Sequence, residues 1–100
     1  MITLYLDTSS SFLYTAIFKN DEMIAEIKEE LNNKLSSYAL TRIEGMLNLK
    51  GITPKSIKKI IVVNGPGSFT GIRIGLTIAK IFAWALSIPI IPISSLEAMA

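Results

Sequence analysis

The segment that most limits the possible folds is a continuous apolar run, Ile60-Ile61-Val62-Val63, followed directly by a glycine-rich stretch. An apolar run of this length without alternation is typical of a strand buried on both faces, as in a parallel sheet. After the glycines, a helical pattern runs from Phe69 or Gly71 to Leu86, and a short strand pattern follows over residues 88–93. Strand, helix and strand in this order predict a right-handed crossover between parallel strands.

The first half of the chain predicts an antiparallel meander and one helix. Residues 2–6, 12–18 and 22–27 have strand character, and Asn20-Asp21 suits a tight hairpin turn between the second and third strands. A helix is expected over Leu35–Leu49, with Gly51 as a left-handed C-terminal cap. A last helix is expected to begin at Ser94 or Ser95. The sequence therefore predicts one α/β domain over residues 1–100, in the order βββαβαβα, with a mixed five-stranded sheet and helices on its faces.

Composition excludes several classes of site. Half of the 100 residues are apolar, which is enough for one core, and the chain has neither cysteine nor histidine. A disulfide framework, a Ser-His-Asp or Cys-His relay and the usual zinc sites are therefore excluded within these residues. We expect a cytoplasmic protein without a membrane segment, because no basic leader and no uninterrupted apolar stretch of about 20 residues is present.

The glycine-rich stretch after the buried strand is a candidate anion or phosphate cradle. A strand-to-helix turn exposes backbone N–H groups and the positive end of a helix dipole, and glycine lets a ligand approach the backbone. The turn after the first strand adds a carboxylate and hydroxyls. The alternative is that these residues only shape tight turns. The candidate residues are Asp7, Thr8, Ser9, Gly65, Gly67, Ser68, Thr70, Gly71 and Arg73.

The helix after Gly71 carries more apolar surface than a surface helix needs. Small residues recur every four positions, at Gly71, Gly75, Ala79 and Ala83, and the polar positions are confined to a narrow seam that Trp84 closes. A helix that is apolar nearly all round is buried on more than one side. Either the first helix or a partner protein is expected to cover the side that the sheet does not.

Basic residues are concentrated in the second half. Between Lys50 and Lys80 the chain has six cationic side chains and no acidic one. The pattern is consistent with a solvated rim at the element ends, or with a patch that faces RNA or another anion.

The stretch Gly65-Pro66-Gly67-Ser68-Phe69-Thr70-Gly71-Ile72-Arg73-Ile74-Gly75 resembles the signature of the bacterial TsaB (YeaZ) family of tRNA threonylcarbamoyladenosine biosynthesis proteins. Asp7-Thr8-Ser9, Ile88-Pro89 and Ser94-Ser95-Leu96-Glu97-Ala98 lie at positions similar to those in the family. The resemblance extends over residues 2–100. It implies one lobe, the N-terminal one, of an actin-like ATPase (ribonuclease H-like) fold, with the family's second lobe absent from this chain.

The resemblance also implies a role. The expected function is that of a non-catalytic accessory subunit, which docks the catalytic paralogue TsaD and supports threonylcarbamoyl transfer to the tRNA adenosine beside the anticodon. A TsaE-like ATPase, ATP and a divalent metal are expected in the partner complex, tRNA is expected to be contacted through that complex, and a homodimer is expected when the chain is alone. We expect the docking faces on the two helices, at Leu40, Ile43, Leu47, Gly71, Gly75, Ile78, Ala79, Phe82 and Ala83.

One departure and two rival functions accompany this resemblance. Family members often carry a histidine near the start of the first helix, where this chain has Leu35-Ser36, so a metal role has no support. The older family label of glycoprotease or peptidase has none either, because no nucleophile–base pair is present. The rivals are an active actin-like phosphotransferase or ATPase that uses Asp7 and Ser68, and an RNA-binding module that uses the basic stretch.

Overall fold

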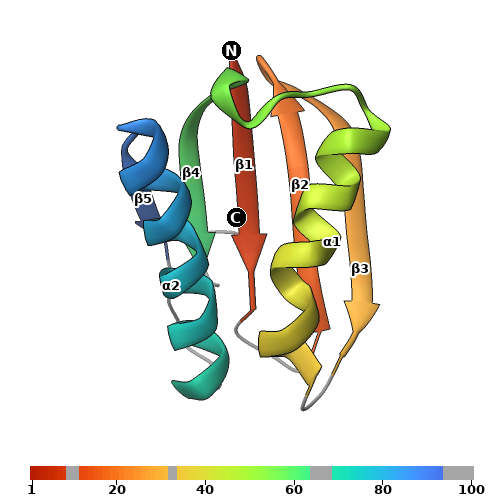
Figure 1. Cartoon of the computed structure of the whole chain (residues 1–100), viewed down its shortest axis with the longest axis vertical. Helices are drawn as coiled ribbons and strands as arrows, with labels where there is room; N and C mark the ends of the chain where they lie inside the picture. The colour runs from red at the N-terminus through yellow and green to blue at the C-terminus, as the bar shows by residue number, and fades with distance from the viewer. Residues whose placement is uncertain (9–11, 32–33, 64–68, 94–100) are drawn as a thin grey trace.

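The chain folds into a mixed five-stranded sheet with two helices packed on it (Figure 1). The structure, a computed structural model, describes residues 1–8, 12–31, 34–63 and 69–93. The strands are β1 (Ile2–Asp7), β2 (Phe12–Lys19), β3 (Glu22–Glu30), β4 (Ile57–Val63) and β5 (Ile90–Ile93). The helices are α1 (Leu35–Leu49), α2 (Phe69–Leu86) and the short 3-10 helix η2 (Pro54–Ser56).

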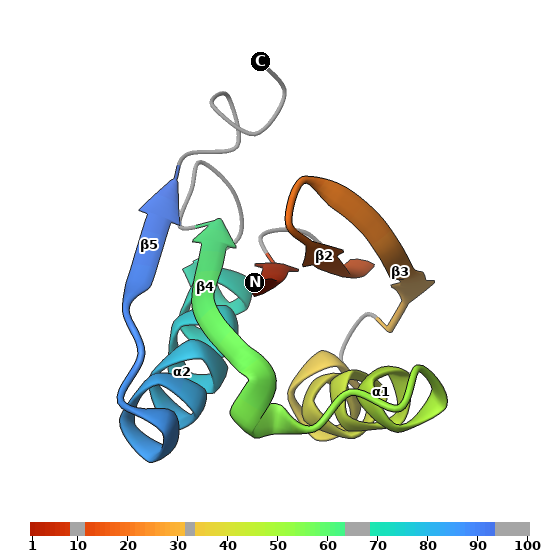
Figure 2. The same ribbon diagram turned by 90° about the horizontal axis from the view of Figure 1, so that it is seen from above.

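The strand order β3-β2-β1-β4-β5 explains where the helices lie. The first three strands pair antiparallel, and β4 pairs parallel with both β1 and β5. Both crossovers, through α1 and through α2, run in the same direction along the sheet, so right-handed connections put both helices on one face (Figure 2). The predicted mixed sheet is confirmed. The predicted last helix falls on residues 94–100, outside the described residues.

Two predicted turns have the expected backbone, whereas several strand bounds differ from the prediction: β3 and β4 are longer by three residues each, β1 and β2 by one, and β5 begins at Ile90 and not at Ile88. Asn20 and Gly51 have positive φ angles of 59° and 66°. Strand β3 continues past Ile27 to Glu30, because its solvated side accepts charged residues while its backbone stays paired with β2. Strand β4 begins at Ile57, before the lysine pair that precedes the apolar run, because a bulge opposite β1 absorbs the extra residue.

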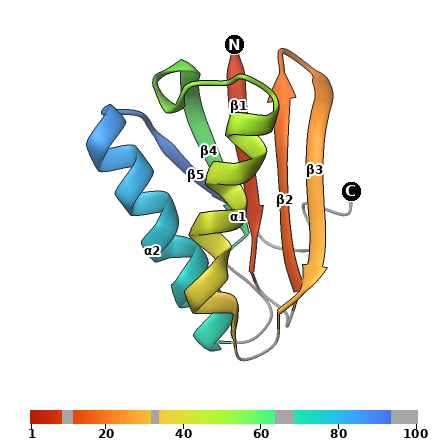
Figure 3. The ribbon, with the colours of Figure 1, turned by 45° about the vertical axis from the view of Figure 1, so that its right-hand side comes forward.

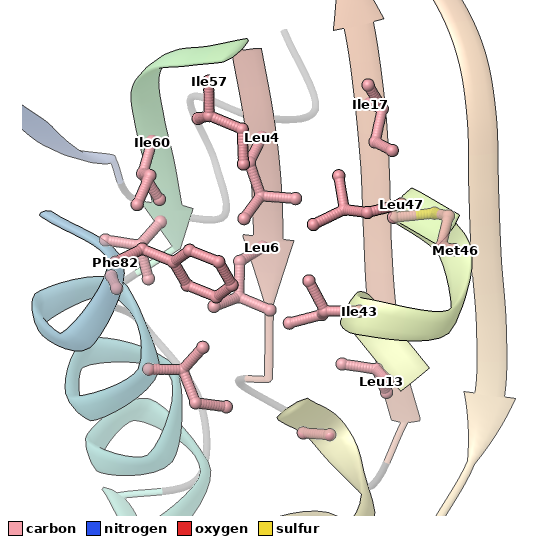
Figure 4. Close-up of a cluster of buried hydrophobic side chains, with 14 of the residues drawn as sticks. Leu4, Leu6, Leu13, Ile17, Ile43, Met46, Leu47, Ile57, Ile60 and Phe82 are labelled. Carbon is pink, nitrogen blue, oxygen red and sulfur yellow. The ribbon is translucent and has the colours of Figure 1, made fainter. Parts of the chain in front are cut away.

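The core lies between the sheet and the two helices (Figure 4). Leu4 and Leu6 on β1 are fully buried and stand at its centre, between Phe82 of α2 and Ile43 of α1. The remaining labelled side chains of this cluster come from β2, β4 and α1: Leu13, Ile17, Met46, Leu47, Ile57 and Ile60. Since residues alternate along β1, Tyr5 and Asp7 point to the opposite face of the sheet.

Candidate functional site

The predicted anion cradle lies where β1 and β4 end and α2 begins. These two strands are parallel, so Asp7 and Val63 end at the same edge of the sheet, and α2 starts there at Phe69. Gly71 is buried and Arg73 is exposed in the first turns of α2, and Thr70 is the second residue of that helix. Ser9, Gly65, Gly67 and Ser68 lie outside the described residues. Anion binding at this edge stays a prediction.

Thr8 has a structural role at this edge. Its side chain is fully buried, and its hydroxyl donates a hydrogen bond to the carbonyl oxygen of Gly71 at 2.5 Å. This bond joins the end of β1 to the first turn of α2 across 63 residues of sequence. The hydroxyl therefore makes an internal hydrogen bond and does not face a ligand. A role in the predicted anion cradle would have required it to face one.

The small-residue stripe of α2 faces the sheet. A Cβ atom added at Gly75 would lie 2.5 Å from the Thr8 hydroxyl oxygen and 3.5 Å from a methyl group of Val62. Only a glycine lets α2 approach β1 and β4 this closely. The small residues that recur every four positions allow close packing, as predicted. At Gly75 the neighbour that approaches closely is the chain's own sheet.

The predicted docking residues are for the most part inside this chain, and docking through them stays a prediction. Most are buried within the chain, because the side of each helix with the strongest apolar periodicity is the side that packs on the sheet. The buried members are Ile43, Leu47, Gly71, Gly75, Ile78, Ala79 and Phe82, and the half-buried ones are Leu40 and Ala83. Outward residues lie between them along each helix.

The two helices lie side by side over one face of the sheet (Figure 3), and each carries large apolar side chains that are exposed. Trp84 on α2 is 90% exposed and Ile81 is 51% exposed; on α1, Leu49 is 83% exposed and Tyr38 is 41% exposed. We call Trp84 and Ile81, with the surface of α2 between them, the outer face; on α1, Leu49 lines the groove toward β3, and Tyr38 lies against Arg42 beside it. The narrow polar seam of α2 in the sequence indicates the outer face. Its residues Arg73, Thr77 and Lys80 are exposed, as Trp84 is.

The face of the sheet opposite the helices has a polar and aromatic hollow that the sequence did not reveal. It is lined by Asp7, Phe12, Tyr14, Glu26 and Lys28. The Tyr14 hydroxyl donates to Glu26 Oε2 at 2.9 Å, and the Tyr5 and Tyr14 rings meet edge to face at 5.8 Å. Burial, and then the bond to Glu26, raise the pKa of Tyr14; burial, and then Asp7, raise the pKa of Tyr5. Both phenols therefore stay protonated at neutral pH. Only the strand register brings these residues together.

Arg42, which lines a groove between α1 and β3, forms an ion pair with Glu29. The guanidinium Nε donates to Glu29 Oε1 at 2.8 Å, and Nη2 to Oε2 at 3.3 Å. The Arg42 guanidinium also lies 5.5 Å from the centre of the Tyr38 ring. This bidentate bond lowers the pKa of Glu29 below its ordinary value, although both side chains are partly open to solvent.

We predict that Arg42→Gln raises the pKa of Glu29 toward its ordinary value, measured by NMR titration of the side-chain carboxyl. Because the folded-state pKa is lowered, the pair stabilises the fold above the ordinary pKa, and this contribution is lost as the pH falls through the folded-state value. Arg73→Gln, on α2, serves as the control and leaves the titration unchanged. An identical Glu29 pKa in the Arg42 variant and the parent contradicts the assignment.

Two features are absent from the part of the chain that the structure describes. Residues 1–8, 12–31, 34–63 and 69–93 contain no group of three or more acidic, histidine or cysteine side chains that could hold a metal ion. Over the same ranges, no helix combines the length and hydropathy needed to cross a membrane.

Comparison with known proteins agrees with this architecture and gives the family. The family model described as TsaD, tRNA N6-adenosine threonylcarbamoyltransferase, matches residues 23–100. The chain belongs to the TsaD family. Its curated relatives place it with the TsaB (YeaZ) members: it is 43% identical over its whole length to the tRNA threonylcarbamoyladenosine biosynthesis protein TsaB of Bacillus subtilis, and 31% identical to TsaB of Escherichia coli.

A solved TsaB-type structure has the same fold. YeaZ from Pseudomonas aeruginosa superposes on 93% of this chain with a TM-score of 0.85 and 26% sequence identity. The chain spans less than half the length of these proteins: 44% of the Bacillus subtilis TsaB, 43% of the Escherichia coli TsaB and 42% of the YeaZ chain. The predicted family resemblance and the ribonuclease H-like lobe are thus confirmed.

Proposed function

We propose that this chain is one lobe of an accessory subunit in tRNA threonylcarbamoyladenosine biosynthesis, and that it acts by docking a TsaD-like catalytic paralogue. The names of its relatives support the pathway. The outer face supports the docking role. In this proposal the lobe itself carries out no bond-making step, and a TsaE-like ATPase and ATP act in the assembled complex.

The observation that carries the docking proposal is the position of Trp84. Arg73, Thr77, Lys80 and Trp84 recur at three or four residues along α2, so they form one line on the helix surface, with Trp84 the most exposed of them. Tryptophan buries a large apolar area on contact and is enriched among residues that dominate binding energy. A tryptophan that is 90% exposed beside Ile81 buries little apolar area within the lobe, and so it fits a surface that a partner covers.

The same surface is proposed to mediate self-association when the paralogue is absent. A two-fold dimer places one patch against its own copy, so Trp84 and Ile81 of each chain would be covered together. The two associations would then compete for one face, and a TsaD-like protein is expected to convert dimers into heterodimers.

Gel filtration of the purified chain with the TsaD-like protein of the same bacterium tests this function. Co-elution at equal stoichiometry is expected, and depletion of the protein in cells is expected to lower threonylcarbamoyladenosine in digested tRNA. Separate elution at micromolar concentrations, together with unchanged tRNA nucleosides after depletion, contradicts the proposal. Turnover of a substrate by the purified chain alone contradicts its non-catalytic part.

A further inference from the structure

Lysines from four separate segments gather at the end of the sheet where β1 and β4 begin. Lys19 ends β2 opposite Ile2, and Ile2 lies opposite Ile57 at the start of β4. The carboxyl end of α1 and the short helix η2 lie at this same end, at the top of Figure 1. We call the resulting group the lysine pole; its members are Lys19, Lys50, Lys55, Lys58 and Lys59.

The bulge in β4 affects the direction of the lysine side chains at this end of the sheet. Ile2 pairs with Ile57 and Thr3 pairs with Lys59, so Lys58 is the extra residue that has no partner position on β1. A bulge redirects the side chain of the inserted residue. Lys58 is exposed and Lys59 is half-buried, and two consecutive ammonium groups thereby reach the surface near η2.

Within the described part of the chain, the lysine pole keeps an excess of positive charge, because its five lysines outnumber the two carboxylates beside Lys19, those of Asp21 and Glu22. Glu22, the first residue of β3, lies opposite Lys19 in the strand pairing, and Asp21 precedes it in the turn between β2 and β3. Among residues that the structure describes, the ion pair within 4.0 Å is the one between Arg42 and Glu29, which involves no lysine of the pole. Glu29 and Glu30 lie at the opposite end of β3, whereas Glu26 lines the groove that Lys50 also lines.

The cationic residues that lie together in the fold are not the same as those of the basic stretch between Lys50 and Lys80. Arg73 and Lys80 lie on α2 and do not belong to the pole, whereas Lys19, which is distant in sequence, joins it. A mere rim of helix and strand ends would leave charges scattered around the molecule. The fold instead places five lysines at one end of the sheet, the end at which the carboxyl end of α2 also lies (Figure 1).

We propose that the lysine pole binds the phosphate backbone of a folded RNA, without reading its bases. This rests on the proposed function, which makes RNA the polyanion that the assembly handles. RNA is favoured over an acidic protein because an exposed lysine–carboxylate pair contributes only about 0–1 kcal/mol. Closely spaced phosphates instead release condensed counterions when lysines bind, and this release drives association at low salt.

The test measures how tightly the full chain binds a tRNA transcript that carries a fluorescent label and no modified nucleosides. Fluorescence anisotropy reports the binding at several salt concentrations. The pole variant Lys55→Glu/Lys58→Glu is compared with Lys28→Glu/Lys34→Glu, which changes the net charge equally at the opposite end of the sheet. The pole variant is expected to bind at least about tenfold more weakly, and its plot of log K against log salt is expected to flatten by about 2. The control is expected to change affinity by less than about threefold.

Several outcomes overturn the proposal: no tRNA binding by the parent chain at about 50 mM salt, equal losses in both variants, or polyglutamate binding as tightly as tRNA. Circular dichroism spectra that match the parent show that the variants fold. The pole variant is expected to co-elute with the TsaD-like protein as the parent does. Failure of the parent to co-elute would contradict the proposed function, whereas loss of tRNA binding with docking intact concerns the pole alone.

Discussion

Replacing Gly75 by alanine is expected to destabilise the lobe, even though alanine is the better helix former by about 1 kcal/mol. The added methyl group would lie 2.5 Å from the hydroxyl oxygen of Thr8, which is fully buried. Thr8 is β-branched and its hydroxyl is bonded to the Gly71 carbonyl, so rotation would leave a buried polar group without its partner. That loss costs about 1–3 kcal/mol, and the rotamer strain adds to it.

The matched control is Gly45→Ala on α1. Both glycines are inside helices, but an added Cβ at Gly45 meets no atom within 4 Å. Gly45→Ala should therefore raise the free energy of unfolding by up to about 1 kcal/mol, while Gly75→Ala should lower it by about 1–2 kcal/mol. Urea and thermal unfolding measure both, and the midpoints should differ by on the order of 10 °C. Equal stabilisation by the two substitutions contradicts the packing of α2 on Thr8.

A double-mutant cycle isolates the contact itself. If Thr8→Ala is combined with Gly75→Ala, the two effects should be less than additive, with a coupling of about 0.5–3 kcal/mol, because the atom that the new methyl group meets is no longer present. Strict additivity would mean that Gly75 is required for a reason other than its approach to Thr8.

Trp84→Glu is expected to abolish docking while the lobe stays folded. The side chain is 90% exposed, so its replacement should change the stability of the lobe by no more than about 0.5 kcal/mol. At an interface, however, the loss of a tryptophan anchor typically costs at least about 2 kcal/mol, and a carboxylate buried without a partner adds to this. Affinity for the TsaD-like protein should therefore fall by at least about 30-fold, as measured by titration calorimetry.

The control for this variant is Met23→Glu on β3. Met23 is 45% exposed and apolar, but it lies on the sheet and outside the helical layer. The same change of charge at this position should leave the affinity unchanged. Equal losses at Met23 and Trp84 would mean that net charge, and not the outer face, governs the association.

The strands and helices were predictable because their signals are local. The alternation after Asn20, the helical spacing from Leu35 and the apolar run at Ile60 each fix an element within a few residues of sequence. The glycine at 51 and the asparagine at 20 occupy positive φ, as their types favour. The order of elements then leaves few parallel arrangements, which is why the mixed sheet could be predicted.

The side of α2 that packs on the sheet could not be predicted, because periodicity does not say which side of an apolar helix meets the sheet. The stripe through Gly75 and Ala79 suits close approach to any neighbour, and only the bond between Thr8 and Gly71 decides that the neighbour is β1. Likewise, the lysine pole depends on Lys19, which a linear reading of the basic stretch leaves out.

The central claim, that a TsaD-like partner covers the outward side of α2 in the proposed complex, is tested most directly at the single tryptophan of the chain. With 5-fluorotryptophan incorporated at position 84, the chain gives one fluorine NMR resonance. Addition of the unlabelled TsaD-like protein should shift this resonance and remove its sensitivity to exchange of H₂O for D₂O, because Trp84 becomes covered. An unchanged, solvent-sensitive resonance in a sample whose components co-elute as a complex would contradict the claim.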